Sequence, residues 1–173
     1  MPLSDWDASI LNTLATGVFA EKRALGKILK AFSFLAKGIV CYPLYVVAFI
    51  FWPAWSDLVG QVVIADLCGL LLLIPLRYIV RRPRPPQRRE HHYMVPWNNY
   101  SFPSGHAVRA FAIATTLVCI AAIWGTILAA LATVIAFSRI TLARHYPSDV
   151  LAGVGIGIVA GLAASQLSGH LFG

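Results

Sequence analysis

Long apolar segments alternate with shorter polar connections along most of the chain. A transmembrane helix needs about 20 predominantly apolar residues to cross the ~30 Å hydrocarbon core of a bilayer. Five segments meet this requirement, at about residues 32–53, 58–77, 104–123, 124–142 and 149–171. The pattern therefore predicts an all-α fold, a polytopic transmembrane helix bundle with five spans.

The N-terminal region has a different pattern. Apolar side chains recur at helical spacing between residues 5 and 20, but this segment is too short and too polar to span a bilayer. We expect an amphipathic helix in the membrane interface, which makes six helices in total; a sixth, tilted span is the alternative. The start of the chain lacks the basic residues and long apolar core of a cleavable signal peptide, so we expect the spans to direct insertion. The whole chain, 1–173, is then one membrane domain, with an interfacial region at 1–30 and a bundle at 32–172.

The composition is typical of a membrane protein, and the net charge limits the classes of ligand that the protein is expected to bind. The 173 residues are 58% hydrophobic and only 12% charged, and the mean hydropathy is +0.72. Soluble domains are about 45–50% apolar and about 25% charged. The formal net charge of +7 suits nucleic acid, anionic lipid or a phosphorylated substrate. A nucleic-acid module should present a soluble basic face, and the sequence contains none, so a phosphorylated lipid and the bilayer itself are the expected partners.

Five alternating spans would bring the longer polar connections to one membrane surface, here called the near side. These connections cover residues 77–106 and 138–149, whereas the far-side turns, at 52–57 and around Trp124, are short. Candidate chemistry should therefore gather at the near side.

The connection before the third span carries features of an anion site. Residues 77–90 contain six arginines, and Pro103, Ser104, Gly105 and His106 mark the start of the span. Proline suits the first turn of a helix, and the free N–H groups of such a turn bind phosphate. Glycine lets an anion approach the backbone closely.

The connection before the fifth span adds Arg139, His145 and Asp149. A neighbouring carboxylate orients a histidine and makes it more basic. Alternatively, Asp149 only occupies the first turn of a helix and His145 is a surface residue. Taken together, two histidines and several guanidinium groups suit phosphoryl transfer. Guanidinium forks match phosphate oxygens, while one imidazole can attack phosphorus and the other can protonate the departing oxygen.

These residues form a three-part pattern. A basic residue is followed after six positions by Arg-Pro, then comes Pro-Ser-Gly-His, and then Ser-Arg with a histidine and an aspartate at fixed spacing. In this chain the parts are Arg77 with Arg84-Pro85, then residues 103–106, and then Ser138-Arg139 with His145 and Asp149. The pattern resembles that of the type 2 phosphatidic acid phosphatase superfamily over about residues 58–160. Arg77 stands where the family usually has lysine, which keeps the charge and changes the donor geometry.

The resemblance implies a role for each residue. His145 would be the nucleophile that forms a phosphohistidine, Asp149 its orienting partner, and His106 the general acid for the leaving group. The phosphate would be held by Arg77, Arg84, Arg139, Ser104 and the backbone around Gly105. This chemistry needs no metal or other cofactor, because guanidinium groups and the helix end supply the positive field.

Several polar residues lie outside the pattern. We expect most of Arg81, Arg82, Arg88 and Arg89 to be solvated or to face headgroups. The adjacent His91 and His92 have no further ligand set nearby and are interpreted as loop residues. The aromatic residues between 93 and 102 are typical of an interfacial belt.

Three ionisable residues lie within the predicted spans. Lys37 and Arg109 are close enough to the near side to reach it with their long side chains. Asp66 is deeper and has no evident partner at its depth, so its role stays open.

The leading interpretation is an integral membrane lipid phosphatase. A vanadate-dependent haloperoxidase would share the phosphate-site pattern, but such proteins are larger and soluble. A lipid transporter or non-catalytic headgroup-binding protein is the alternative from another class, although it needs no pair of histidines. Lipid A 1-phosphate and undecaprenyl diphosphate rank equally as substrates, followed by phosphatidylglycerophosphate or phosphatidate.

The distribution of charge gives a conflicting indication of orientation. Nearly every lysine and arginine lies on the near side, which by the positive-inside rule would face the cytoplasm. The resemblance implies a bacterial inner-membrane protein whose active site faces the periplasm. We expect the periplasmic orientation, because a phosphate site recruits arginines for its own reasons.

Overall fold

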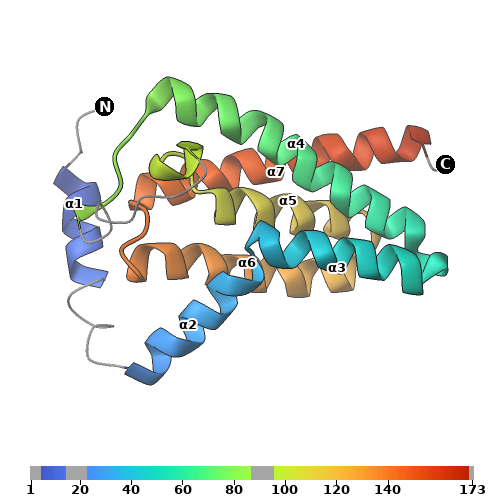
Figure 1. Ribbon diagram of the computed structural model, residues 1–173, viewed down its shortest axis with the longest axis horizontal. Coiled ribbons are helices and arrows are strands. Elements are labelled where there is room, and N and C mark those ends of the chain that lie inside the picture. The colour runs from blue at the N-terminus through green and yellow to red at the C-terminus, as the bar shows by residue number, and fades with distance from the viewer. Residues whose placement is uncertain (1–4, 15–22, 87–95, 172–173) are drawn as a thin grey trace.

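The computed structural model describes residues 5–14, 23–86 and 96–171, and these residues form a helical bundle (Figure 1). The elements are α1 (Asp5–Asn12), α2 (Arg23–Leu35), α3 (Gly38–Phe51), the 3-10 helix η2 (Pro53–Trp55), α4 (Ser56–Val80), the 3-10 helix η4 (Pro96–Asn99), α5 (Gly105–Ile120), α6 (Ala122–Thr141) and α7 (Pro147–Leu171). The predicted all-α class is confirmed.

Several helices are long and apolar enough to cross a membrane. Three qualify individually, over Pro53–Val80, Ala122–Thr141 and Pro147–Leu167. A bent pair, Leu25–Leu35 with Gly38–Phe51, makes a fourth candidate, and α5 is a shorter apolar helix. The described part of the chain is therefore a multi-pass membrane bundle with three or four candidate spans, and the exact set of five stays a prediction.

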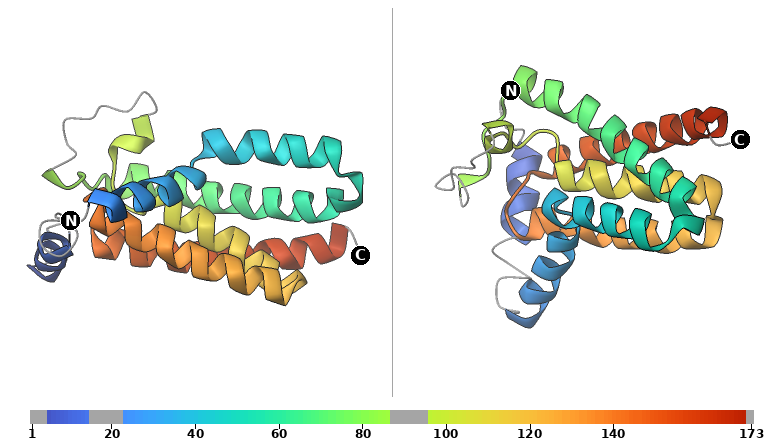
Figure 2. Two further views of the ribbon diagram at one scale, coloured as in Figure 1. Left: turned by 90° about the horizontal axis from the view of Figure 1, so that it is seen from below. Right: turned by 45° about the vertical axis from the view of Figure 1, so that its right-hand side comes forward.

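The prediction of one continuous helix over 32–53, and with it the total of six helices, is wrong. The structure has seven α-helices in its described residues, because the chain breaks between Leu35 and Gly38 and bends by 53°. The right-hand view of Figure 2 shows α2 directed away from the bundle axis. The break frees the carbonyl of Ala36 to accept a hydrogen bond from Arg109, 3.3 Å away. A Cβ atom at Gly38 would lie 2.8 Å from the ring of Tyr42, so a larger residue here would have to displace that ring.

Helix α5 lies at the centre of the bundle and packs against α4, α6 and α7. Its contact with α7 is backbone to backbone, because α7 carries a glycine at every fourth position of the shared face. A Cβ atom at Gly153, Gly157 or Gly161 would lie 2.6–2.7 Å from a carbonyl oxygen of α5 or its N-cap. Small residues permit this close approach in membrane bundles. The beginnings of α5 and α7 are thereby held side by side, and the N–H of Ser104 donates to the carbonyl of Asp149.

Helix α1 covers the beginning of α7. Its Asp7 is 2% exposed and accepts hydrogen bonds from the N–H and the hydroxyl of Ser148, at 2.9 and 2.5 Å. Asp7 thus caps α7 from a distant part of the chain. Residues 5–14 of the predicted amphipathic segment are helical and residues 15–20 lie outside the described residues, so its position in the interface stays a prediction.

Candidate active site

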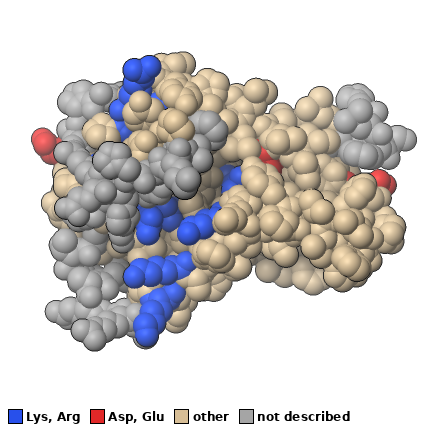
Figure 3. Space-filling view, in the orientation of Figure 1, with Lys and Arg blue, Asp and Glu red and all other residues tan. Residues whose placement is uncertain are grey.

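The predicted site residues come together at one end of the bundle, on the left of Figure 1. A cavity of about 780 Å³ opens there, lined by six of the eight residues: Arg77, Arg84, Gly105, His106, Arg139 and His145. Ser104 and Asp149 are fully buried beside them. In the space-filling view, lysine and arginine atoms gather over the same half of the molecule and in its hollow (Figure 3). The near-side residues therefore share one cationic pocket.

His145 lies in the turn between α6 and α7 and is 1% exposed. Its Nδ1 atom is 2.7 Å from the carbonyl oxygen of Ser101. Because a carbonyl can only accept, Nδ1 carries the proton of the neutral ring and Nε2 keeps its lone pair. Nε2 lies 3.3 Å from Nη1 of Arg84, so its lone pair faces a guanidinium group of the pocket.

The surroundings of His145 favour the neutral ring. Burial lowers its pKa well below the ordinary value of 6.5, and the positive charges of Arg84, Arg139 and Arg77 lower it further. The carbonyl of Ser101 acts in the opposite direction. A neutral imidazole with an available lone pair is the form that can act as a nucleophile.

Asp149, the expected orienting partner of His145, lies near its ring but outside hydrogen-bond distance. Its Oδ2 is 3.8 Å from Nδ1 and instead accepts the N–H of Tyr146 at 2.9 Å, while Oδ1 accepts from Arg82 at 2.6 Å. The ring is oriented by the carbonyl of Ser101, a contact that the sequence motif did not indicate. By accepting the N–H of Tyr146, Asp149 helps to fix the turn in which His145 lies.

His106 lies in the first turn of α5, directly after Gly105 and the N-cap Ser104. The residue lines the cavity, and its buried Nε2 has no hydrogen-bond partner among the described residues. The backbone beside it has little spare room, because a Cβ atom at Gly105 would lie 3.2 Å from Nη2 of Arg77.

The three motif arginines are fixed by oxygen acceptors. Arg77 donates to the carbonyl of Pro103 and to Oδ1 of Asn98, while Arg84 donates twice to the carbonyl of Asn98, at 2.9 and 2.6 Å. Arg139 donates to the hydroxyl of Ser33 on α2. Asn98 and Ser33 were missed by the sequence analysis, since neither belongs to a motif. The only signal for Ser33 is a polar residue within an otherwise apolar helix face.

Arg82 differs from its prediction as a solvated residue. It is 6% exposed and donates to Asp7 at 2.7 Å, and to Ser148 and Asp149 at 2.6 Å each. Its guanidinium also lies 4.4 Å from the ring centroid of Tyr146. Arg81 is exposed as predicted. Arg88, Arg89, His91, His92 and Tyr93 lie outside the described residues.

Asp66 and Arg109 also differ from their predictions. Arg109 is 9% exposed and does not reach the surface, because its Nε donates to Oδ1 of Asp66 at 2.8 Å. Its Nη2 donates to the hydroxyl of Tyr42 at 2.8 Å. Lys37 is exposed, with its Nζ 4.9 Å from the ring of Phe34. Asp66 thus has a partner at its own depth, on the neighbouring helix.

Metal ligands do not cluster in the described part of the chain. No group of three or more histidine, cysteine, aspartate or glutamate side chains there could hold a metal ion. The positive charge of the pocket comes from guanidinium and ammonium groups.

Comparison with known proteins gives the same class as the motifs. The PAP2 superfamily matches residues 54–171. YbjG of Escherichia coli K12, which is assigned as an undecaprenyl-diphosphatase, is 31% identical over 145 residues, covering 79% of this chain and 73% of that protein. The crystal structure of Aquifex aeolicus LpxE is 28% identical, with a TM-score of 0.74 over 96% of this chain and 99% of that one. A PAP2-type phosphatidylglycerolphosphate phosphatase from Bacillus subtilis, 20% identical with a TM-score of 0.75, shares the fold over 95% of this chain and 85% of its own.

The chain therefore belongs to the PAP2 superfamily, as its three motifs predicted. Its class is that of the lipid phosphatases of membranes.

Proposed function

We propose that this protein hydrolyses a phosphate monoester or diphosphate of a membrane lipid through a phosphohistidine on His145, without a metal ion. One observation carries the proposal. His145 and His106 line a single cavity with Arg77, Arg84 and Arg139, and the contact with Ser101 leaves the lone pair on Nε2 of His145.

In the first step, Nε2 of His145 attacks phosphorus and the bond from phosphorus to the lipid oxygen breaks. The departing oxygen takes a proton from His106. Burial and then the charge of Arg139 lower the pKa of His106, and the negative charge of the bound phosphate acts in the opposite direction and favours its protonated form. The three arginines and the N–H groups at the start of α5 hold the remaining phosphate oxygens. In the second step, water gives its proton to His106 and attacks the phosphohistidine, the phosphorus–nitrogen bond breaks, and inorganic phosphate leaves.

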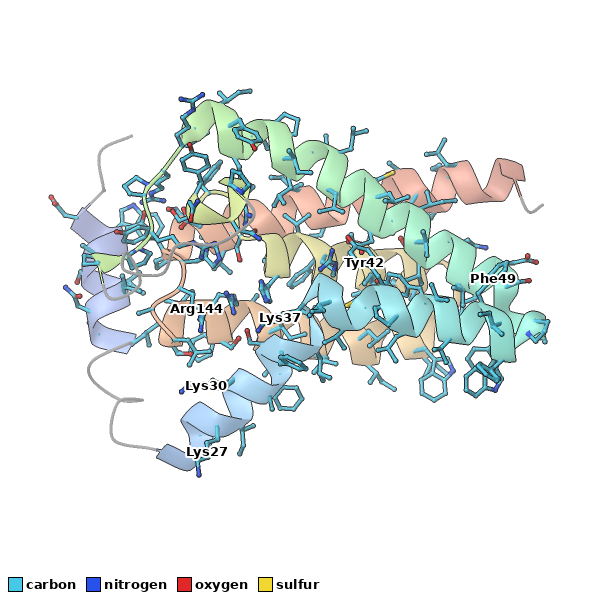
Figure 4. The ribbon with its side chains drawn as sticks, in the orientation of Figure 1. Lys27, Lys30, Lys37, Tyr42, Phe49 and Arg144 are labelled. Carbon is cyan, nitrogen blue, oxygen red and sulfur yellow. The ribbon has the colours of Figure 1, made fainter. Side chains whose placement is uncertain are left out.

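The candidate substrates are lipid A 1-phosphate and undecaprenyl diphosphate, followed by phosphatidylglycerophosphate or phosphatidate. The relationship to YbjG supports the diphosphate. Lys30, Lys37 and Arg144 also line the cavity, and Figure 4 shows them on α2, at the corner that follows it and after α6. These added charges suit a lipid with more than one anionic group.

The activity is tested with purified protein in detergent, offered each candidate lipid in the presence of a chelator. We expect release of inorganic phosphate that is insensitive to the chelator, and a labelled phosphoenzyme after rapid denaturation at alkaline pH. In His145→Ala, both the released phosphate and the phosphoenzyme should be lost. Phosphate release that requires a metal, or that survives in His145→Ala, would contradict the mechanism. Lipid binding without any phosphate release would favour the transporter or headgroup-binding alternative.

We further propose that the protein lies in a bacterial inner membrane with the pocket facing the periplasm. A cysteine introduced at the exposed Asn99, with Cys41, Cys68 and Cys119 replaced by serine, reports the orientation. Labelling in intact spheroplasts by a membrane-impermeant maleimide is expected. Labelling only after lysis would place the pocket in the cytoplasm.

A further inference from the structure

The buried pair of Asp66 and Arg109 lines the same cavity as the two histidines, but the phosphate chemistry does not use it. Asp66 is 2% exposed, and its Oδ1 accepts from Arg109. Its other oxygen, Oδ2, is buried and has no hydrogen-bond partner among the described residues. A buried carboxylate oxygen without a donor is costly, so an oxygen left in this state next to a cavity indicates a place for a donor from outside the chain.

The position of this oxygen relative to the phosphate pocket follows from helix geometry. Arg109 is three residues beyond His106, about one turn along α5. Leu73 of α4 faces Gly105, and Gly69 faces Val108, so Asp66 lies roughly 10 Å below the level of the pocket. The cavity wall between the two levels carries the apolar Leu70, Leu73 and Ile74. A ligand with its phosphate at the histidines therefore meets an apolar stretch and then the carboxylate.

Tyr42 and Arg109 hold the carboxylate in place. Arg109 connects three elements, since it donates to Asp66 on α4, to the hydroxyl of Tyr42 on α3 and to the carbonyl of Ala36 at the corner after α2. Figure 4 shows Tyr42 in the first turns of α3, where that helix passes α4 and α5. With Oδ1 held in this way, Oδ2 has a fixed position.

We propose that Oδ2 of Asp66 accepts a hydrogen bond from a hydroxyl or amide N–H of the substrate lipid, about 10 Å from the reacting phosphorus. This inference rests on the proposed function and narrows its substrate class. A carboxylate only accepts hydrogen bonds and repels a second phosphate, so its ligand is a neutral donor. The subsite favours lipids with hydroxylated or amide-linked acyl chains over polyprenyl lipids, whose tails contain no donor. A site built to hydrogen-bond a group discriminates strongly against analogues that lack it.

The first experiment compares matched lipids on the wild-type protein. Two synthetic lipid monophosphates of equal chain length are used, one with an amide-linked 3-hydroxyacyl chain and the other with a plain ester-linked chain. A polyprenyl monophosphate is the third probe. We expect kcat/KM to be at least about tenfold higher for the donor-bearing lipid, in line with the discrimination that such polar groups provide. Equal values for the matched pair would overturn the proposal.

Binding to His145→Ala separates this inference from the proposed function. The dissociation constants of the same lipids, measured by intrinsic tryptophan fluorescence, should show the same preference without any turnover. If the wild-type protein releases no phosphate but His145→Ala prefers the donor-bearing lipid, the phosphatase mechanism fails and the subsite stands. Equal affinities for the matched lipids would refute the subsite.

The second experiment changes the acceptor. Asp66→Asn keeps the shape but presents an amide N–H in place of the oxygen. The ratio of kcat/KM for the donor-bearing lipid to kcat/KM for the plain lipid should fall about tenfold, a change that a general loss of stability would not produce. Asp57→Asn, the same change at an exposed position on α4, is the matched control and should leave all substrates unaffected. An equal loss for every substrate would show that Asp66 only stabilises the bundle.

Discussion

Two buried acid–arginine clusters connect distant parts of the chain, and they differ in how fully their oxygens are used. Arg82 lies between Asp7 and Asp149 at the near-side end, where both oxygens of each carboxylate accept hydrogen bonds. The pair of Asp66 and Arg109 lies deeper and leaves one oxygen without a partner in the described structure. The first cluster, here called the clasp, uses all four carboxylate oxygens, and its one atom without a partner among the described residues is Nε of Arg82. The second is incomplete, as expected of a group that contacts a ligand.

Replacing Arg82 should have the largest effect on stability. In Arg82→Met two buried carboxylates lose their shared cation. We therefore expect the free energy of unfolding to fall by an amount at the upper end of the ~3–5 kcal/mol measured for broken buried pairs. Unfolding in detergent, followed by circular dichroism, gives the loss. Arg81→Met, an exposed neighbour, is the control. A loss below about 1 kcal/mol would show that the clasp contributes little.

Replacing Arg109 should reduce the free energy of unfolding by less. Arg109→Met leaves a single carboxylate without its cation, and that carboxylate borders a cavity that can admit water. We therefore expect a decrease near the lower end of ~3–5 kcal/mol. The same unfolding measurement applies. If Arg109→Met is as destabilising as Arg82→Met, the contrast between the clusters is wrong.

Asp7→Asn tests the contribution of α1 to the clasp. The amide retains one acceptor for Ser148 but loses the ion pair with Arg82, so a loss of about 1–3 kcal/mol is expected. Exposed Asp5→Asn on the same helix is the matched control. Full stability in Asp7→Asn would mean that α1 is not needed to hold the start of α7.

The smallest predicted effect is a shift in the pH profile of activity. In the proposed mechanism only neutral His145 attacks phosphorus. Its pKa is lowered by burial and then by the arginines, so kcat/KM should stay high to a pH well below 6.5. In Arg84→Gln one positive charge is lost, the pKa of His145 rises, and the acid limb should move to higher pH. The whole profile falls as well, because a phosphate contact is removed.

A second variant serves as the control for this shift in the acid limb. Lys27→Gln removes an exposed charge that does not line the cavity, and its acid limb should stay in place. An acid limb of Arg84→Gln that moves to lower pH would contradict the assignment of His145 as the group that must be neutral.

The sequence predicted the pocket well because each motif is local. Residues 103–106 and 138–149 specify their own turns, and alternating helices bring those turns to one end. The clasp could not be predicted, since Asp7 and Arg82 are separated by 75 positions and belong to no shared pattern. The break before Gly38 was missed because apolar residues lie on both sides of Lys37 and Gly38, so the average hydropathy of the segment still indicates a single span. The pairing of Asp66 with Arg109 is not visible in the sequence, because the two residues lie at different distances from the ends of their predicted spans. The packing of α4 against α5 and the long side chain of Arg109 bring them together.

The glycine face of α7 has a consequence for how the pocket can admit a lipid. His106 lies in the first turn of α5 and His145 two residues before α7, and the glycines of α7 bring the backbones of these two helices into close contact. This close contact leaves little room for the two helices to move apart, so it holds the spacing of His106 and His145. In the proposed mechanism, a pocket that widens for a bulky lipid would do so at α2 and α3, on the other side of the bend, with the spacing of the two histidines unchanged.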